Sequence, residues 1–417
     1  MLTTEKLRSF PLSANSELST ESGVHMGALC YFRGVIMLNT NEIKFRPDGK
    51  LIVMQVSDPQ DMKYVRKAMV NMLNKAYDKL RPDLVLFTGD NILGNHLLDA
   101  RFGSRQIASG KAATLQIMKE SIRHITKPLD ERKIPFAMIY GNHDDMNAVS
   151  KDEQADIYRQ SPMCMPMNTR NGKVDCDTYN IPVLSSDGEK ILFNFWMLDC
   201  AWYDKKEDKC YQGIKPETLE WYKKTAAELK EKNGGEPVPS LVFAHIPLPQ
   251  IYNLVEQCGQ NDIGAVKTHR GYYRLRPDVA RGSMGELPCV LEDDGGLFDA
   301  ALECGDVKGF VSGHDHRNCF EGKYKGIDFI QSSCASFRCY GDKTRGVRIF
   351  EFDERAPEEY MTYFFNYDEL CGRGVAAKAR YFWDADELEK KKYTALATVA
   401  TAATVAAGVA KALIKKK

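Results

Sequence analysis

Two histidines separated by a single residue occur in the last third of the chain, in Gly313-His314-Asp315-His316. They follow the stretch 307–312, whose β-branched and aromatic residues predict a short buried strand. A glycine at the end of a strand lets the backbone turn tightly, so both imidazoles can face one cavity and bind metal. Taken alone, the same residues also fit a polar turn in which both histidines are solvated.

Polar side chains recur in the same way after other predicted strands, which span residues 51–56, 84–88, 136–140 and 240–244. The residues that follow these strands are Asp58 and Gln60, then Asp90, then Asn142 with His143 and Asp144, and finally His245. In open α/β sheets, ligands bind in the crevice beyond the carboxyl ends of the strands. Core packing does not explain polar residues there, so we expect these side chains to meet at one site.

The carboxylates, amide oxygen and imidazoles of this set suit divalent metals such as Mn, Fe, Zn or Ni. A calcium site would contain only oxygen ligands, and a structural zinc site would use cysteine. The set offers more ligands than one ion needs, whereas two ions about 3.5–4 Å apart would use them all with one bridging carboxylate. Asp90 is the best placed bridge, because it follows a short, rigid strand. Such a pair of ions lowers the pKa of a bridging water and holds an anionic phosphate ester for attack.

Each residue also has an ordinary structural interpretation. Asp90 and Asn91 could form a turn, and His245 alone fits a hydrogen-bonded core histidine. Asp199 follows a strand but has no place in the metal pattern, so we interpret it as structural. Residues 272–276, with two tyrosines and two arginines, fit a solvated loop better than a substrate-facing rim. The metal interpretation therefore depends on the whole set.

Strands and helices alternate around these residues, which predicts the α/β class. Hydrophobic periodicity predicts helices at 61–80, 112–133, 216–232 and 296–303, and further strands at 43–45, 191–198, 327–331 and 346–352. Residues 43–56 are expected to form a strand, a turn and a strand. We expect 94–110, 150–180 and 257–289 to be loops that shape the pocket.

Length and composition allow one large elaborated domain, since the chain has 417 residues and is 43% hydrophobic. Lys+Arg and Asp+Glu both number 57, so no global basic excess favours nucleic acid as a partner. The 12 cysteines form no CxxC pair, and the N-terminus lacks a secretory signal pattern. These features indicate a reducing, cytoplasmic environment.

The C-terminal end has a different composition. Residues 394–410 form an uncharged Ala/Thr/Val-rich tract with lysines on both sides. Its length is near the lower limit for a membrane span, and its composition is only weakly hydrophobic. A membrane-associated tail is therefore the alternative to a cytoplasmic protein, and a helix packed on another subunit or a loosely ordered tail is a third interpretation.

The order of the polar blocks resembles the calcineurin-like metallophosphoesterases over about residues 50–352. The blocks are Asp58-Pro-Gln60, Gly89-Asp90-Asn91, Gly141-Asn142-His143-Asp144, His245-Ile246-Pro247 and Gly313-His314-Asp315-His316. Within this superfamily the chain is most similar to the purple-acid-phosphatase-related group that lacks the purple iron site. Leu93 stands where the purple enzymes carry a tyrosine ligand, so a purple Fe(III) site is not expected.

The resemblance implies a four-layer α/β/β/α sandwich of two mixed sheets flanked by helices, with a dinuclear metal centre. Asp58 and His316 would bind the first metal, Asp90 would bridge, and the second metal would be bound by Asn142, His245 and His314. His143 would face the substrate, to donate to a phosphate oxygen or protonate the leaving group, and Asp144 would orient it. Asn142 would also stabilise charge on the phosphate.

Gln60 departs from the family pattern, which has histidine there. An amide oxygen is a neutral, harder donor than imidazole, so the first site is expected to be weaker or to favour Mn, Mg or Fe over Zn. Asp61 is an alternative ligand.

We expect an N-terminal extension at 1–45, a catalytic domain at 46–355 and a helical tail at 356–417. The expected function is a metal-dependent phosphatase or phosphodiesterase with a metal-bridging hydroxide as nucleophile, and the substrate stays open. A non-catalytic or regulatory metal-binding protein on the same fold, and a nuclease, are the alternatives.

Overall fold

The computed structural model describes residues 30–32, 35–37, 42–93, 110–145, 149–167, 174, 178–200 and 211–395. The chain divides into two compact units, Met1–Thr40 and Asn41–Lys417. In the first unit, β1 (Cys30–Phe32) pairs antiparallel with β2 (Val35–Met37). The second unit carries every candidate site residue. Most of the predicted loop at 94–110 and nearly all of the Ala/Thr/Val-rich tract lie outside the described residues.

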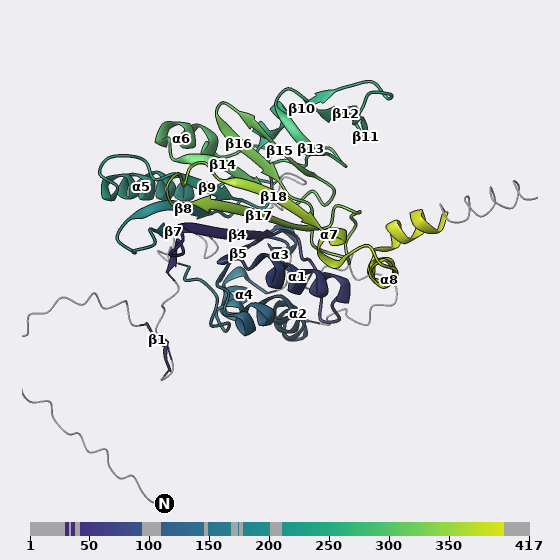
Figure 1. The fold of residues 1–417 in the computed structure, drawn as a ribbon, viewed down its shortest axis with the longest axis horizontal. Coiled ribbons are helices and arrows are strands. Elements are labelled where there is room, and N and C mark those ends of the chain that lie inside the picture. The colour runs from purple at the N-terminus through teal and green to yellow at the C-terminus, as the bar shows by residue number, and fades with distance from the viewer. Residues whose placement is uncertain are drawn as a thin grey trace, which may run out of the picture. The chain divides into compact units, whose positions relative to one another are not determined.

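Two mixed β-sheets form the centre of the second unit (Figure 1). The five-stranded sheet consists, in spatial order, of β18 (Met361–Asn366), β17 (Gly346–Asp353), β4 (Lys50–Val56), β5 (Leu84–Thr88) and β6 (Phe136–Ile139). The eight-stranded sheet consists of β13 (Ala280–Ser283), β15 (Cys319–Tyr324), β16 (Ile327–Gln331), β14 (Val307–Ser312), β9 (Ser240–Phe243), β8 (Ile191–Met197), β7 (Tyr179–Leu184) and β3 (Ile43–Lys44). Strands β4, β5 and β6 run parallel, as do β8, β9, β14 and β16. In each sheet the carboxyl ends of these parallel strands therefore share one edge.

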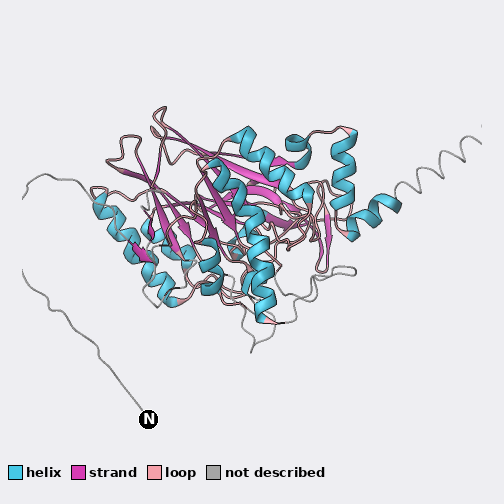
Figure 2. Cartoon of the chain, turned by 90° about the horizontal axis from the view of Figure 1, so that it is seen from below, coloured by secondary structure: helices cyan, strands magenta, loops and turns pink. Residues whose placement is uncertain are grey.

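Helices cover the outer faces of both sheets (Figure 2). The helices are α1 (Lys67–Leu80), α2 (Lys111–Arg132), α3 (Asn142–Asp145), α4 (Lys151–Tyr158), α5 (Pro216–Lys232), the 3-10 helix η1 (Pro249–Leu254), α6 (Leu297–Cys304), α7 (Tyr367–Cys371) and α8 (Val375–Asp384). The first two belong to the core of the five-stranded sheet, whereas α5 and α6 pack on the eight-stranded sheet. This arrangement confirms the predicted four-layer α/β/β/α sandwich.

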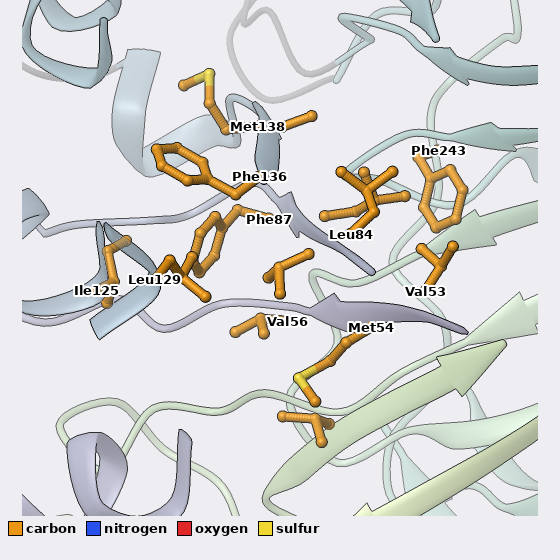
Figure 3. Close-up of a cluster of buried hydrophobic side chains, with 14 of the residues drawn as sticks. Val53, Met54, Val56, Leu84, Phe87, Ile125, Leu129, Phe136, Met138 and Phe243 are labelled. Carbon is orange, nitrogen blue, oxygen red and sulfur yellow. The ribbon is translucent and has the colours of Figure 1, made fainter. Parts of the chain in front are cut away.

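Alternation of side chains along the strands builds two separate cores. On β9, Leu241 and Phe243 face the core between the sheets, while Val242 faces the core beneath α5 and α6. On the far side of the five-stranded sheet, Ile125 and Leu129 of α2 lie close to the aromatic side chains of β5 and β6 (Figure 3). The central strands of both sheets are thus buried on two faces, which leaves their carboxyl ends as the places where polar residues can gather.

The helix predicted at 61–80 starts later than expected, at Lys67. Asp61 prevents an earlier start, because its carboxylate accepts hydrogen bonds from the backbone N–H groups of Met62 and Arg66 at 2.8 and 2.7 Å. Such local side-chain bonds compete with helical backbone bonds. The predicted strand, turn and strand at 43–56 are confirmed, although the two strands do not pair with each other: β3 pairs with β7, and β4 pairs with β5 and β17.

Two predicted loops contain regular structure. Residues 150–180 include α4 and the start of β7, and residues 257–289 include β13 and most of a three-stranded sheet of β10 (Val255–Gln257), β12 (Gly271–Leu275) and β11 (Val266–Thr268). Strand β18, in the stretch assigned to the tail, extends the five-stranded sheet by pairing with β17. Within the described ranges, no helix combines the length and apolar character needed to cross a bilayer.

Candidate metal centre

The polar residues that follow the parallel strands meet at the shared edge of the two sheets. Potential ligand atoms of Asp90, His245 and His314 lie within 4.8 Å of one another, and so do those of Asp58, Asp90 and His316. Asp90 is the one member common to both groups. His245 and His314 thus fall in one group and His316 in the other, which is the division between two metal ions that the resemblance implies.

Close packing of the strand-end loops requires glycine at two points. A Cβ atom on Gly313 would overlap Ser57 Oγ and lie 2.7 Å from Asp58 Oδ2, and one on Gly141 would overlap Asp90 Oδ1. The expected tight turn at Gly313 is not its role, because the left-handed residue is His314, with φ of 68°. Gly313 instead lets the loop after β14 approach the loop after β4.

Four candidate ligands occupy the left-handed region of backbone space: Asp58, Gln60, Asp90 and His314, with φ of 48°, 28°, 47° and 68°. Each such residue costs about 1–3 kcal/mol and persists only where surrounding contacts hold it. The backbone N–H of Gln60 donates to the carbonyl of Asp90 at 2.9 Å, and Ser336 N–H donates to the carbonyl of Asp58 at 3.0 Å. Strain that gathers at one buried cluster is typical of a functional site.

Hydrogen bonds fix both buried carboxylates. Asp58 Oδ2 accepts from the backbone N–H of His314 at 3.1 Å and from the Ser57 hydroxyl. Asp90 Oδ1 accepts from the backbone N–H of His143 at 2.8 Å, and its Oδ2 accepts from Gln60 Nε2 at 3.1 Å. Neighbouring loops therefore hold both carboxylates in place.

Backbone carbonyls orient two of the histidines. His245 Nδ1–H donates to the carbonyl of Thr88 at 2.9 Å, and His316 Nδ1–H donates to that of Tyr340 at 2.7 Å. The Nε2 atoms consequently face the carboxylates, 3.4 Å from Asp90 Oδ1 for His245 and 3.5 Å from Asp58 Oδ1 for His316. Metal-binding histidines typically show this arrangement, with the second ring nitrogen bound to an oxygen acceptor.

The segment after β6 brings three further predicted residues to the site. Asn142 Oδ1 lies 3.1 Å from His245 Nε2, and His143 Nε2 lies 3.9 Å from Asp90 Oδ2. The His143 side chain is 22% exposed, whereas those of Asp90 and His245 are almost completely buried. His143 is thus the member of this group that a solute can reach.

Asp144 holds two loops together from beneath the site. Its buried carboxylate accepts hydrogen bonds from the backbone N–H groups of Gly141 at 2.9 Å, Asn91 at 3.1 Å and Ile92 at 3.3 Å. Burial and the nearby charge of Asp90 raise the pKa of Asp144 to about 7. These bonds join the loops after β5 and β6, whereas the orientation of His143 by Asp144 stays a prediction of the resemblance.

Three buried polar atoms of the cluster have no hydrogen-bond partner: Asp58 Oδ1, Gln60 Oε1 and His314 Nδ1. Leaving such atoms unpaired away from water is costly. Each has a lone pair that suits a divalent cation, and they come from two loops of one site, the loop after β4 and the loop after β14. The residues present therefore fit the metal ions that the resemblance implies.

The charges of the buried histidines and carboxylates also favour a site for metal ions. Burial opposes protonation of His245, yet the carboxylates of Asp90 and Asp58 raise its pKa to about 9. Burial and repulsion from His245 lower the pKa of His314 to about 3. His245 thus favours its charged form and His314 its neutral form, because burial and the neighbouring charge on His245 outweigh the attraction of the carboxylates for a proton on His314.

Asp61 does not join the cluster. Its carboxylate pairs with Arg338 at 2.5 Å and with backbone N–H groups of its own loop, so the interpretation of Asp61 as a substitute ligand is not supported. Asp199 pairs with Lys151 at 2.6 Å, in agreement with its structural interpretation.

Sequence patterns miss two contacts at the site. The Tyr340 ring stacks on His316 with centroids 4.3 Å apart, and the Tyr211 ring meets the edge of His314 at 5.2 Å. Neither tyrosine follows a predicted strand, and the hydrogen bond from His316 uses the backbone of Tyr340, so no residue pattern could have identified them.

A family model described as "Calcineurin-like phosphoesterase" matches residues 51–318. The "Probable inactive purple acid phosphatase 14" of Arabidopsis thaliana is 24% identical over 347 residues, which cover 74% of this chain and 77% of that protein. The "Phosphatase DCR2" of Saccharomyces cerevisiae is 26% identical over 212 residues, which cover 48% of this chain and 31% of that protein. Among solved structures, a dimetal phosphatase from Danio rerio is 13% identical with a TM-score of 0.42, covering 76% of this chain and 99% of that one.

Proposed function

Since this chain belongs to the calcineurin-like phosphoesterase family, we propose that it hydrolyses phosphoester bonds at the cluster around Asp90. One observation carries the proposal: two groups of potential ligands share Asp90, and buried polar atoms of Asp58, His314 and the neighbouring Gln60 have no hydrogen-bond partner. A purely structural polar cluster would satisfy its atoms internally.

Two divalent cations held there would lower the pKa of a water molecule and neutralise the charge of a phosphate ester. Asp58 and His316 would hold one ion, Asp90 would contact both, and Asn142, His245 and His314 would hold the other. Gln60 Oε1 would add a neutral oxygen to the first ion. Oxygen-rich ligands of this kind favour Mn, Mg or Fe over Zn at the first position.

His143 would act on the substrate. Its side chain is 22% exposed beside the carboxylate shared by both groups, and its backbone N–H donates to that carboxylate at 2.8 Å. The ring would donate to a phosphate oxygen or protonate the leaving group, a role that typically contributes about 10²–10⁴-fold to the rate. The amide of Asn142 would stabilise charge on the phosphate.

The test combines a panel of phosphomonoesters and phosphodiesters with several divalent metals and elemental analysis of the purified protein. Asp90→Asn should lose both metal ions and activity, whereas His143→Ala should keep its metal and lose at least about 10²-fold in kcat. His269→Ala is a matched control, because this exposed histidine lies in the turn between β11 and β12. Full activity in both site variants would overturn the mechanism.

A non-catalytic metal-binding protein is the second candidate, favoured by Gln60 in a position where the family has histidine. The names of the Arabidopsis relatives contain the word inactive. This candidate predicts at most one tightly held metal ion per chain and no turnover with any substrate of the panel. Two bound ions together with turnover would exclude it.

A further inference from the structure

The C-terminal end of the described chain exposes a group of large apolar side chains. Val375, Phe382 and Trp383 of α8 are 86%, 43% and 73% exposed, and Leu388 and Tyr393 in the helical stretch 387–395 are 52% and 38% exposed. We call these five residues the α8 patch. Exposed apolar residues scattered singly are common, but a contiguous group indicates a binding surface.

Two observations show that the patch is contiguous. Val375, Phe382 and Trp383 are seven and eight positions apart along α8, so they share one side of the helix. The rings of Phe382 and Tyr393 lie 6.4 Å apart, which joins the stretch 387–395 to α8. Figure 1 shows both helical segments beside α7, outside the layers of the two sheets.

The opposite side of these segments is anchored in the domain. Asp384 Oδ2 accepts from the backbone N–H of Ala68 at 2.7 Å, and Asp386 accepts from Arg345 at 2.8 Å. Glu389 is also buried and pairs with Arg345. Asp384, Asp386 and Glu389 are therefore turned inward and engaged, while the exposed Glu387 pairs with Lys390 and the apolar residues of the patch face outward.

The outward charge is positive. Lys378, Lys391 and Lys392 are exposed and form no ion pair within the described part of the chain. The sequence beyond continues with an uncharged tract and ends in further lysines. Aromatic residues next to lysines, on a helix too short to span a bilayer, are typical of segments that lie in the interfacial region of an anionic membrane.

We propose that the α8 patch docks on the surface of an anionic lipid bilayer. Trp383 and Phe382 would enter the headgroup region, and Lys378, Lys391 and Lys392 would face the lipid charge. Attraction to anionic lipid falls off within a Debye length, so added salt should weaken the interaction. The apolar residues explain why a soluble acidic protein is the poorer fit: it would pair with the lysines and leave the aromatic rings in water.

The experiment measures co-sedimentation of the full-length chain with vesicles of phosphatidylcholine, alone or mixed with phosphatidylserine. The native chain should bind the mixed vesicles and bind phosphatidylcholine weakly. The double variant Phe382→Ala with Trp383→Ala should reduce binding to the mixed vesicles at least about tenfold. The double variant Lys391→Glu with Lys392→Glu should reduce this binding by about fivefold or more for each lysine. All four side chains are exposed, so thermal unfolding should not change.

Matched controls lie elsewhere on the surface. Ile263→Ala removes an apolar side chain that is 93% exposed, and Lys230→Glu with Lys232→Glu reverses two exposed charges on α5. These variants should bind as the native chain does. Equal binding by patch variants and controls would overturn the proposal, as would no binding to either vesicle. Self-association that the patch variants abolish, without vesicle binding, would assign the patch to a second copy instead.

Discussion

Gln60 donates through Nε2 to Asp90 Oδ2 at 3.1 Å, while its own Oε1 is buried without a partner. The residue that departs from the family pattern thus contacts the carboxylate common to both ligand groups. In the proposed metal centre, this amide would compete with a cation for one oxygen of Asp90 and would offer a weaker oxygen in return. We therefore expect the strength of the proposed first metal site to depend on this side chain.

Gln60→His should strengthen the first site. Imidazole is a better ligand than an amide oxygen for Zn, Mn or Fe, and the replacement also removes the hydrogen bond that occupies Asp90 Oδ2. We expect the affinity for the more weakly bound ion to rise by about tenfold, in the range that changes around metal sites typically produce. Calorimetric titration of the metal-free protein with the metal ion measures this affinity. Gln60→Ala is the comparison variant, and equal affinities in the two would contradict a ligand role at this position.

His316 and His245 should control different ions. His316→Ala should release the first metal ion during stepwise dialysis against a chelator while the second stays bound, and His245→Ala should reverse this order. Elemental analysis after each step gives the metal-to-protein ratio, with His269→Ala as control. Loss of both ions at once in His316→Ala would contradict the assignment of separate ligand groups.

The strand-end residues were predictable because their strands are mostly apolar and an Asp, Asn or His follows two or three residues after each strand ends. A buried strand of this kind has no other use for a polar residue at its end, so the edge of the sheet could be deduced without knowing the strand order. Contacts between residues that are far apart in the sequence could not be predicted from such patterns. The carbonyl of Tyr340 orients His316, and Ser336 binds the backbone of both Asp58 and Gln60, but neither lies in an element with a recognisable period.

Helix α4 was not predicted, although its start has a sequence signature. Ser150 and Glu153 form a reciprocal capping box at the start of α4, and their spacing is the sequence signature of a helix start. Helix α4 is mostly polar, so apolar periodicity does not indicate it. Strand β18 was missed for a related reason: its residues are mostly half-exposed, so it lacks a clear buried face.

Ser150→Ala should therefore destabilise the protein through α4. Loss of an N-cap typically costs about 0.5–2 kcal/mol in the free energy of unfolding. The effect should reach the site, because Gln154 of α4 donates to the carbonyl of Asp144 at 2.9 Å. Chemical denaturation compares this variant with Lys119→Ala, an exposed position on α2. A free energy of unfolding equal to that of the control would show that the cap contributes nothing.

Arg345 should link the C-terminal helical segment to the first metal site. Its completely buried guanidinium pairs with Asp386 and Glu389 and donates to the carbonyl of Ser336 at 2.6 Å. Ser336 in turn donates to the carbonyl of Gln60 at 3.1 Å. Breaking a buried ion pair on one side typically costs about 3–5 kcal/mol.

Glu389→Gln keeps the shape of this side chain and removes its charge, so the free energy of unfolding should fall by about 3 kcal/mol. Because the loop that contains Ser336 and Tyr340 braces Gln60 and His316, the affinity for the first metal ion should fall more than that for the second. Denaturation and metal titration measure the two effects. Glu387→Gln removes an exposed charge two residues away and should change neither quantity. If Glu389→Gln lowered both metal affinities equally, the loop would not act specifically on the first site.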